Sequence, residues 1–254
     1  MDFKVLGCYG ARLPGQGTTS FLINDNLLVD AGTVTWLLDL EQQMCIDDIL
    51  LTHAHLDHVV DLAFIADNVL PFRDRPIKVW APAEVLDGVH QNMFNNVLWP
   101  DFTTIKVGEE PILKFCPLEK GKTVEISGIT VRWQPTNHTV YTAGYLLEDH
   151  GRSLLLSGDT GPTEAIWKLG HQAQGLQAVL AEVSFPNRLE ELALISGHLT
   201  PGLLAKELAK LDRPDVPIWV FHMKPQFLDE IIAELNELQG LDLKMLRGNE
   251  VLNI

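Results

Sequence analysis

The sequence has 254 residues, and its 34 acidic and 19 basic side chains give a formal net charge of −15. This charge disfavours a broad surface for nucleic acids, because binding to a phosphate backbone needs clustered lysine and arginine. Hydrophobic residues make up 46% of the chain, as in ordinary globular proteins, and no apolar run approaches the roughly 18 residues of a transmembrane helix.

The three cysteines, Cys8, Cys45 and Cys116, are scattered along the chain. They form neither a disulfide framework nor a Cys-x-x-Cys zinc motif, and they fit free thiols in a reducing compartment. The N-terminal residues lack a basic segment followed by a long apolar stretch, so no secretory signal is visible. We therefore expect a soluble protein of the cytoplasm with no membrane partner.

The first third of the chain is predicted to alternate short apolar strands with turns. Glycine and proline mark a loop at 10–17, and Asn24-Asp25-Asn26 fits the turn of a hairpin. Pro71 ends the last helix of this part, because proline cannot continue a helix. In chain order we expect strands at 3–8, 20–23, 26–29 and 49–51, and helices at 36–44 and 61–70.

The rest of the chain is predicted to hold a run of strands and then an alternation of strands and helices. Thr200 is expected to cap a helix that has Pro201 at its first position. The expected strands are 77–80, 123–126, 130–134, 144–147, 153–156, 176–183 and 218–221, and the expected helices are 82–95, 200–211 and 226–238.

No repeat, low-complexity segment or linker interrupts the chain, so a single domain over residues 1–254 is expected. The β-rich first half followed by a strand–helix alternation indicates an α/β fold with two packed sheets. Each sheet must bury its outer face under helices, which predicts an αββα sandwich.

Residues 52–58, Thr-His-Ala-His-Leu-Asp-His, directly follow an expected buried strand. Three imidazoles and a carboxylate within six residues are difficult to explain by packing, and this donor set suits zinc and related divalent ions. From a tight loop at a strand end, the four side chains can face one ion or divide between two.

Four more polar residues follow expected strands or precede an expected helix. His138, Asp159 and His222 each lie in a loop just after a predicted strand, and His198 lies just before the helix at 200–211. Such positions are typical of functional side chains that a rigid scaffold holds in place.

This set resembles the metallo-β-lactamase-fold hydrolases, and the turn Val29-Asp30-Ala31-Gly32 adds to the likeness. The resemblance covers nearly the whole chain and is specific for the fold, but it does not choose a reaction. The residues that carry it, in chain order, are His53, His55, Asp57, His58, His138, Asp159 and His222.

The resemblance implies a site for two divalent metal ions. His53, His55 and His138 would hold the first ion, Asp57, His58 and His222 would hold the second, and Asp159 would bridge them. Two such ions can share a hydroxide and lower its pKa toward ~7. The affinity order of divalent metals favours Zn²⁺ modestly, and Mn²⁺ and Fe²⁺ also suit these ligands.

Residues 181–187 with 197–201, and residues 93–102, resemble segments of the class II cyclic-nucleotide phosphodiesterases. The implied reaction is hydrolysis of cAMP or cGMP to the 5′-monophosphate by a metal-bridging hydroxide. In that site His198, oriented or kept protonated by Glu182, would be the general acid or a phosphate ligand. Related enzymes commonly dimerise, which makes a homodimer an expectation.

Two alternatives stay open. The Glu and Gly-His pair is shared in outline with the tRNA 3′-processing endonucleases (ribonuclease Z), although the net charge disfavours a polyanionic substrate. A non-catalytic ligand-binding protein on the same fold is the other alternative, and the complete set of seven candidate ligands argues against it.

Three further roles are hypotheses about single residues. Asn95 and Asn96 offer amide groups that fit contact with a nucleotide base, and the segment 94–102 around them fits either a wall for that base or a core or dimer contact. Asp61 stands where the superfamily usually has glycine. Its carboxylate is expected either to orient a ligand imidazole or to begin the helix.

Overall fold

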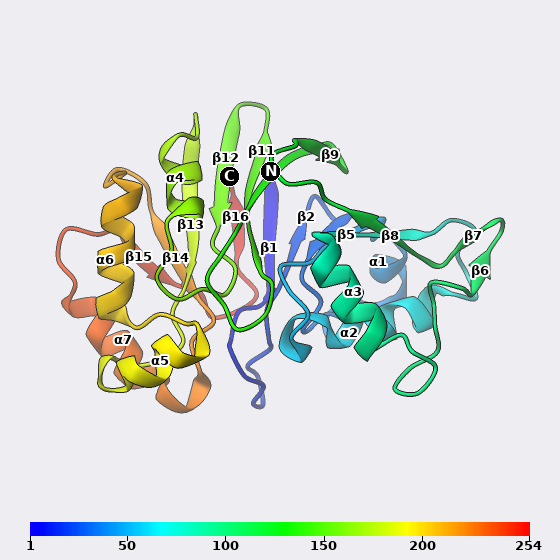
Figure 1. Cartoon of the computed structure of the whole chain (residues 1–254), viewed down its shortest axis with the longest axis horizontal. Helices are drawn as coiled ribbons and strands as arrows, with labels where there is room; N and C mark the ends of the chain where they lie inside the picture. The colour runs from blue at the N-terminus through cyan, green and yellow to red at the C-terminus, as the bar shows by residue number, and fades with distance from the viewer.

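The computed structural model describes all 254 residues and shows two β-sheets packed face to face between two layers of helices (Figure 1). The expected αββα arrangement is confirmed. The first sheet has seven strands in the order β16 (Val251–Asn253), β1 (Asp2–Gly7), β2 (Ser20–Ile23), β3 (Leu27–Val29), β4 (Asp48–Leu50), β5 (Ile77–Ala81) and β8 (Leu113–Pro117).

The second sheet also has seven strands, and a separate hairpin lies beside the first sheet. The second sheet has the order β15 (Leu243–Met245), β14 (Ile218–Phe221), β13 (Leu176–Glu182), β12 (Arg152–Leu156), β11 (Ala143–Asp149), β10 (Ile129–Pro135) and β9 (Val124–Ile126). The hairpin consists of β6 (Lys106–Val107) and β7 (Glu110–Pro111).

The helices divide between the two outer faces, which lie at the left and right of Figure 1. The first sheet is covered by α1 (Leu40–Met44), α2 (Leu56–Val69) and α3 (Ala83–Asn92), and the second by α4 (Ala165–His171), α6 (Pro201–Leu211) and α7 (Leu228–Glu237). A short α5 (Glu190–Ser196) and two 3₁₀ turns, η1 (Asn187–Leu189) and η2 (Pro225–Phe227), lie in the loops near one end.

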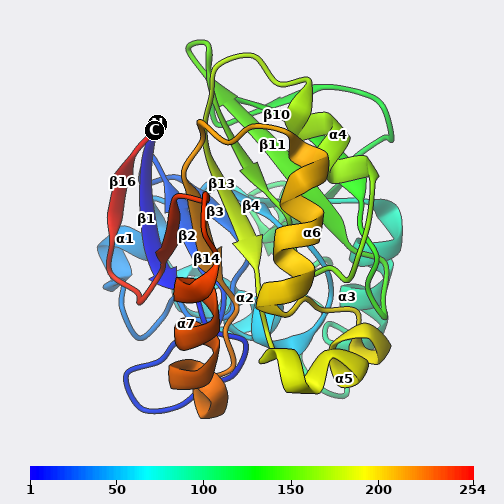
Figure 2. The ribbon, with the colours of Figure 1, turned by 90° about the vertical axis from the view of Figure 1, so that its left-hand side faces the viewer.

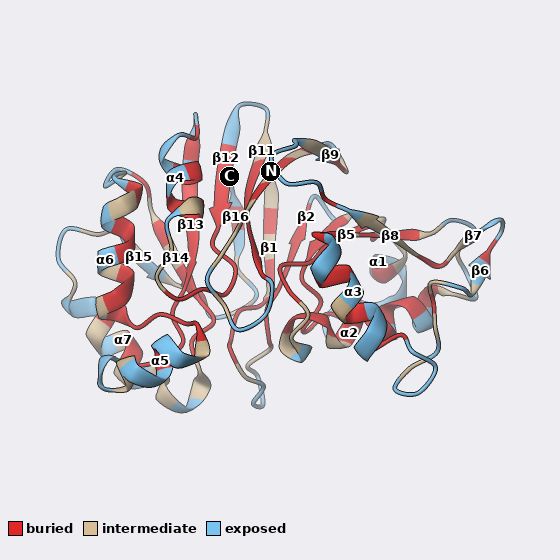
Figure 3. Cartoon of the chain, viewed as in Figure 1, coloured by how far each residue is buried: buried red, intermediate tan, exposed pale blue.

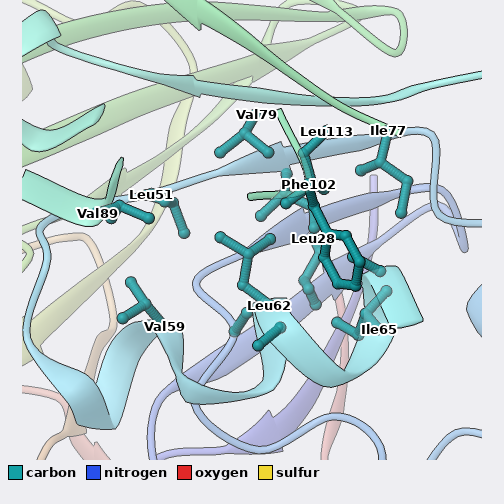
Figure 4. Packing of buried hydrophobic residues seen from close by; sticks show 14 of the residues in the cluster. Leu28, Leu51, Val59, Leu62, Ile65, Ile77, Val79, Val89, Phe102 and Leu113 are labelled. Atoms are coloured by element: carbon teal, nitrogen blue, oxygen red, sulfur yellow. The ribbon is translucent and has the colours of Figure 1, made fainter. Parts of the chain in front are cut away.

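Three apolar clusters fill the three spaces between these four layers. Most of the strands are buried, and the helices alternate between buried and exposed residues (Figure 3). The central cluster joins the sheets through residues such as Phe21, Tyr145 and Phe221. In the first outer cluster, Leu62 and Ile65 of α2 pack against strand residues (Figure 4). Four layers need three such interfaces, so the apolar pattern of each strand and helix is satisfied.

The strand directions bring many loop residues to one edge of the sandwich. Strands β3, β4, β5 and β8 run parallel in the first sheet, and β12 to β15 run parallel in the second. The carboxyl ends of parallel strands share one edge of a sheet, where ligand sites are usually found. This edge is the lower one in Figure 2, far from the two termini.

Helix α2, which covers the first sheet, begins five residues earlier than predicted, at Leu56 and not at Asp61. The Asp57 and His58 side chains therefore project from the first turn of α2, while His53 and His55 precede it. The sequence predicts a loop over residues 56–60 because the polar ligand residues interrupt the apolar pattern of the helix. The cap at Thr200 is confirmed, because its hydroxyl accepts a hydrogen bond from the Leu203 amide.

Candidate metal centre

The structure brings all seven predicted ligand residues together at the strand ends. Within each of two groups, the ligand atoms lie within 4.8 Å of one another: His53, His55 and His138 in one, and Asp57, His58 and His222 in the other. The same division was expected from the resemblance.

Asp159, in the loop after β12, lies between the two groups. Its Oδ2 atom is 3.6 Å from Nε2 of His53, in the first group. In the second group it is 3.4 Å from Nε2 of His58 and 3.2 Å from Nε2 of His222. A carboxylate in this place can contact cations in both groups, as a bridging ligand must.

Two buried atoms at this point have no hydrogen-bond partner, Nε2 of His53 and Oδ1 of Asp159. An unsatisfied buried polar atom costs about 1–3 kcal/mol, so native proteins rarely leave one without a purpose. One is an imidazole nitrogen and the other a carboxylate oxygen, and both are typical ligands of divalent cations. The residues present thus fit a metal ion here.

The outer nitrogen of each of four imidazoles is held by a neighbouring group, which directs Nε2 toward the centre. The Nδ1 contacts are His53 with Thr52 Oγ1 at 2.9 Å, His58 with Asp30 Oδ2 at 2.8 Å, His138 with the Gly197 carbonyl at 2.8 Å, and His222 with Ser184 Oγ at 2.8 Å. Such contacts fix the tautomer and orientation of metal-binding histidines.

Two of these positions have a backbone conformation that side-chain-bearing residues rarely adopt. Asp30 has a φ of 55° and His222 a φ of 65°, both in the left-handed region. Such conformations cost of order 1–3 kcal/mol and cluster at functional sites. Here they turn the chain sharply at the ends of β3 and β14, so that both side chains point into the site.

The electrostatics of the first group favour neutral imidazoles. Burial lowers the pKa of His53 well below its usual range, and the nearby His58 adds to the effect. Burial likewise lowers the pKa of His55 and His138. Because a metal ion binds only deprotonated imidazole, these three side chains are ready to act as ligands.

The second group holds opposite charges together. Burial alone would raise the pKa of Asp159, but His222 and His58 outweigh it and hold this pKa well below its usual range. Burial would lower the pKa of His58, but Asp159 and Asp30 raise it strongly. A cation bound at Nε2 of His58 would meet the Asp159 carboxylate, whose Oδ2 lies 3.4 Å from that nitrogen.

A buried carboxylate–imidazole pair borders the cluster, formed by Glu182 at the end of β13 and His198 before α6. Nδ1 of His198 lies 3.1 Å from Oε1 of Glu182, which also accepts a hydrogen bond from the Leu199 amide at 3.1 Å. The His198 ring stacks on that of His222, with 5.2 Å between centroids. Nε2 of His198 is thus the nitrogen available to a substrate.

Ser184 connects this pair to the cluster and was missed from the sequence. Its hydroxyl lies 3.0 Å from Oε2 of Glu182, 3.1 Å from Nδ1 of His198 and 2.8 Å from Nδ1 of His222. Thr52 and Asp30 have comparable roles, because they contact Nδ1 of His53 and of His58. Serine, threonine and aspartate are so common in turns that only the distinctive turn at 29–32 gave any signal.

The structure does not bring Asn95 and Asn96 together with the histidines. The Asn95 amide donates to the Gln91 carbonyl and accepts from the amides of Val97 and Leu98, and the Asn96 side chain accepts from the Asp101 amide. Both side chains serve the loop after α3. Their contact with substrate stays a prediction that this geometry does not favour.

The aromatic residues at the ends of that segment belong to the core. Phe94 and Phe102 are buried in the first outer cluster, with ring centroids 6.0 Å apart. The interpretation as a wall for a base is therefore wrong for these two residues, which belong to the core, whereas Val97 and Leu98 between them are exposed.

Asp61 neither begins the helix nor orients an imidazole. It lies in the second turn of α2, where Oδ2 accepts hydrogen bonds from the amides of Val34 (2.6 Å) and Thr35 (2.7 Å). Both hypotheses for this residue were wrong. The carboxylate instead ties the loop that follows the Asp30 turn to the helix that carries Asp57 and His58.

A cleft of about 550 Å³ lies elsewhere, between the loop 10–17, the turn 33–37 and residues 247–249. It is lined by none of the seven ligand candidates.

No helix in the structure combines the length and apolarity needed to cross a membrane. The three cysteines are free, as expected.

Comparison with curated sequences finds relatives that are named phosphodiesterases. A probable 3′,5′-cyclic-nucleotide phosphodiesterase of Yersinia pestis is 28% identical over 206 residues, which are 72% of this chain and 58% of that protein. A 3′,5′-cyclic-nucleotide phosphodiesterase of Aliivibrio fischeri is 28% identical over 83% of this chain and 75% of its own length. A ribonuclease Z of Mycobacterium bovis is 27% identical over half of the chain.

Solved structures show the same fold at low sequence identity. Unliganded yeast PDE1 superposes with a TM-score of 0.82 at 18% identity and covers 96% of both chains. The short form of human tRNase Z gives a TM-score of 0.72 at 16% identity, over 100% of this chain and 99% of that one.

The family comparison agrees with the fold and with the resemblance seen in the sequence. A family model described as beta-lactamase superfamily domain matches residues 25–223, a range that includes all seven candidate ligands. The chain therefore belongs to the beta-lactamase superfamily.

Proposed function

We propose that this protein is a metal-dependent phosphodiesterase that hydrolyses 3′,5′-cyclic nucleotides to 5′-monophosphates. The relatives from Yersinia pestis and Aliivibrio fischeri are named for this activity. The observation that carries phosphodiester hydrolysis is the pair of Glu182 and His198, which places an imidazole beside the cluster with one nitrogen held and the other available. The choice of a cyclic nucleotide rests on the names of these two relatives.

The seven residues would hold two divalent cations, with Asp159 between them. Such ions supply an activated water molecule and neutralise the charge that builds on a phosphoryl group. Zn²⁺ is the metal we propose first, and Mn²⁺ and Fe²⁺ suit the same histidine and carboxylate ligands.

The protein's own residues would complete the reaction. Water adds to phosphorus opposite the 3′ oxygen, and the bond between phosphorus and that oxygen breaks. The ribose oxygen is a poor leaving group unless it receives a proton, and Nε2 of His198 can donate it. Glu182 would hold the imidazolium in place through Nδ1.

A substrate panel tests the proposal. Purified protein with its metal content measured is assayed against cAMP, cGMP, bis(p-nitrophenyl) phosphate and a precursor tRNA. We expect turnover of at least one cyclic nucleotide and loss of this turnover with a chelator. Two bound metals without turnover of either cyclic nucleotide would contradict the proposal.

A second candidate function is ribonuclease Z activity, which the relatives named ribonuclease Z favour. The Glu182–His198 pair suits any phosphodiester and does not separate the two functions. The net charge of −15 disfavours a polyanionic RNA. Cleavage of precursor tRNA in the same panel would identify this function instead.

The state of the cysteines bears on the cellular compartment of the protein. Three free cysteines fit a reducing environment, where disulfides do not persist. We propose the cytoplasm on this basis.

A further inference from the structure

The proposed site is built from groups that would repel an anionic substrate. Asp30, Asp57, Asp159 and Glu182 place four carboxylates in or directly behind it. Two divalent cations would balance these four charges, and of the groups in the site only a protonated His198 would add a positive charge for a phosphodiester monoanion. Because the whole chain carries −15, a local positive charge is needed to attract the substrate.

Lys224, two residues after His222, lies beside this site. Its Nζ donates a hydrogen bond to the Gly10 carbonyl at 3.0 Å and lies 5.3 Å from the centre of the Phe185 ring. That ring is in turn 5.9 Å from the ring of His198. Lys224 is thus held between the loop after β1 and the residue next to the candidate general acid.

Gly10 fixes this position tightly. A Cβ atom on Gly10 would lie 2.5 Å from the His222 carbonyl oxygen and 2.8 Å from Nδ1 of His222. The backbone of Gly10 therefore packs directly against His222, and the carbonyl that holds the Lys224 ammonium is part of the same contact. A side chain at position 10 would clash with His222, so the backbone that holds the lysine would have to move.

The charge of Lys224 is not paired with a carboxylate, unlike that of Arg188, which forms an ion pair with Glu230 at 2.8 Å. Arg12, like Lys224, donates to a backbone carbonyl, that of Gly32, but only Lys224 is held against Phe185 beside His198. Lys224 has no carboxylate within ion-pair distance. An ammonium group has three donors, and the Gly10 carbonyl uses only one of them.

We propose that Lys224 is a substrate-binding residue that contacts the phosphate of the incoming phosphodiester. The inference rests on the proposed phosphodiesterase function and adds to it the source of affinity for the anion. A hydrogen bond to a charged group contributes enough to change affinity by roughly 10- to 100-fold.

The test compares K224M, which keeps the length of the side chain but removes its charge, with K224R, which keeps the charge. K120M, at an exposed lysine in the turn after β8, is the matched control. We expect K224M to raise KM for bis(p-nitrophenyl) phosphate roughly 10-fold or more, with kcat and metal content nearly unchanged. K224R and K120M should stay near the wild type.

A binding measurement keeps this inference separate from the proposed function. Inorganic phosphate is titrated into each metal-loaded protein by calorimetry, and K224M should bind it roughly 10-fold more weakly. Equal KM and equal phosphate affinity in K224M and wild type would overturn the role of Lys224 and leave the phosphodiesterase intact. A wild-type protein that hydrolyses no phosphodiester would overturn the proposed phosphodiesterase function. The comparison of phosphate affinities would still test the role of Lys224.

Discussion

At the scale of single residues, the proposed reaction depends most on the protonation of His198. Burial lowers the pKa of this imidazole, but the carboxylate of Glu182 outweighs burial, and the pKa is raised above its ordinary value of 6.5. The acid form is therefore fully populated below that value and is lost as the pH rises through the raised pKa. A general acid with this property still works near neutral pH.

This assignment predicts a pH effect that two variants separate. E182Q should lower the pKa of His198 and shift the alkaline decline of kcat/KM to lower pH. H198Q should lower kcat by about 10²–10⁴-fold and remove that decline, with the metal content retained. The exposed His150 provides the control H150Q. Full activity of H198Q with both metals bound would exclude the general-acid role.

Ser184 is predicted to position both His222 and Glu182. Removing its hydroxyl in S184A leaves Nδ1 of His222 and Oε2 of Glu182 without this partner. We expect metal affinity to fall about 10- to 100-fold, measured by competition with a chromogenic chelator. S184T keeps a hydroxyl and should recover much of the affinity. The control is S196A, at the end of α5.

An unchanged metal affinity in S184A would mean that the backbone alone positions His222. This residue also shows the limit of prediction from sequence. Several imidazoles and carboxylates at strand ends indicate metal ligands, because few other functions place so many of these groups at strand ends. A serine at such a position is compatible with many turns, and only the three-dimensional contacts distinguish it.

At the scale of elements, the beginning of α2 determines how the histidine motif is used. Its first turn carries Asp57 and His58, and the preceding residues His53 and His55 turn to the other side. An acidic residue in the first turn of a helix also interacts favourably with the helix dipole and stabilises the helix. The sequence could predict the donors, but the helix boundary was wrong because the ligands obscure its apolar pattern.

Asp61 is predicted to be a structural contact of this helix. Its buried carboxylate receives two backbone amides and the hydroxyl of Thr35. D61A leaves these donors unsatisfied and should lower the free energy of unfolding by about 1–3 kcal/mol, measured by urea denaturation with chelator present. D67A, at an exposed position of the same helix, should have little effect. Equal stability of D61A and wild type would refute this role.

The elements that could not be predicted are short or half-exposed. In α5, Leu192, Leu194 and Ile195 are exposed, so the helix has no apolar face that packs on a sheet. Strands β15 and β16 have three residues each and only partial burial. By contrast, β14 was predicted with its exact bounds, because a short apolar run between proline and histidine leaves little choice.

At the scale of the whole molecule, the fold gathers residues from position 30 to position 222 at one edge. The sequence could indicate this, because carboxyl ends of parallel strands meet. It could not indicate which loops reach the rim. Leu56 on α2 and Val97 and Leu98 after α3 are large apolar residues that lie exposed. The expected homodimer stays a prediction.

We propose that the seven residues form a two-metal centre that hydrolyses cyclic nucleotides. The most direct measurement titrates Zn²⁺ or Mn²⁺ into chelator-treated protein and follows the hydrolysis of cAMP and cGMP together with the number of bound ions. We predict that activity returns as two ions bind each chain, and that D159A neither retains both ions nor recovers activity. Two bound ions without hydrolysis, or hydrolysis that persists without metal, would contradict it.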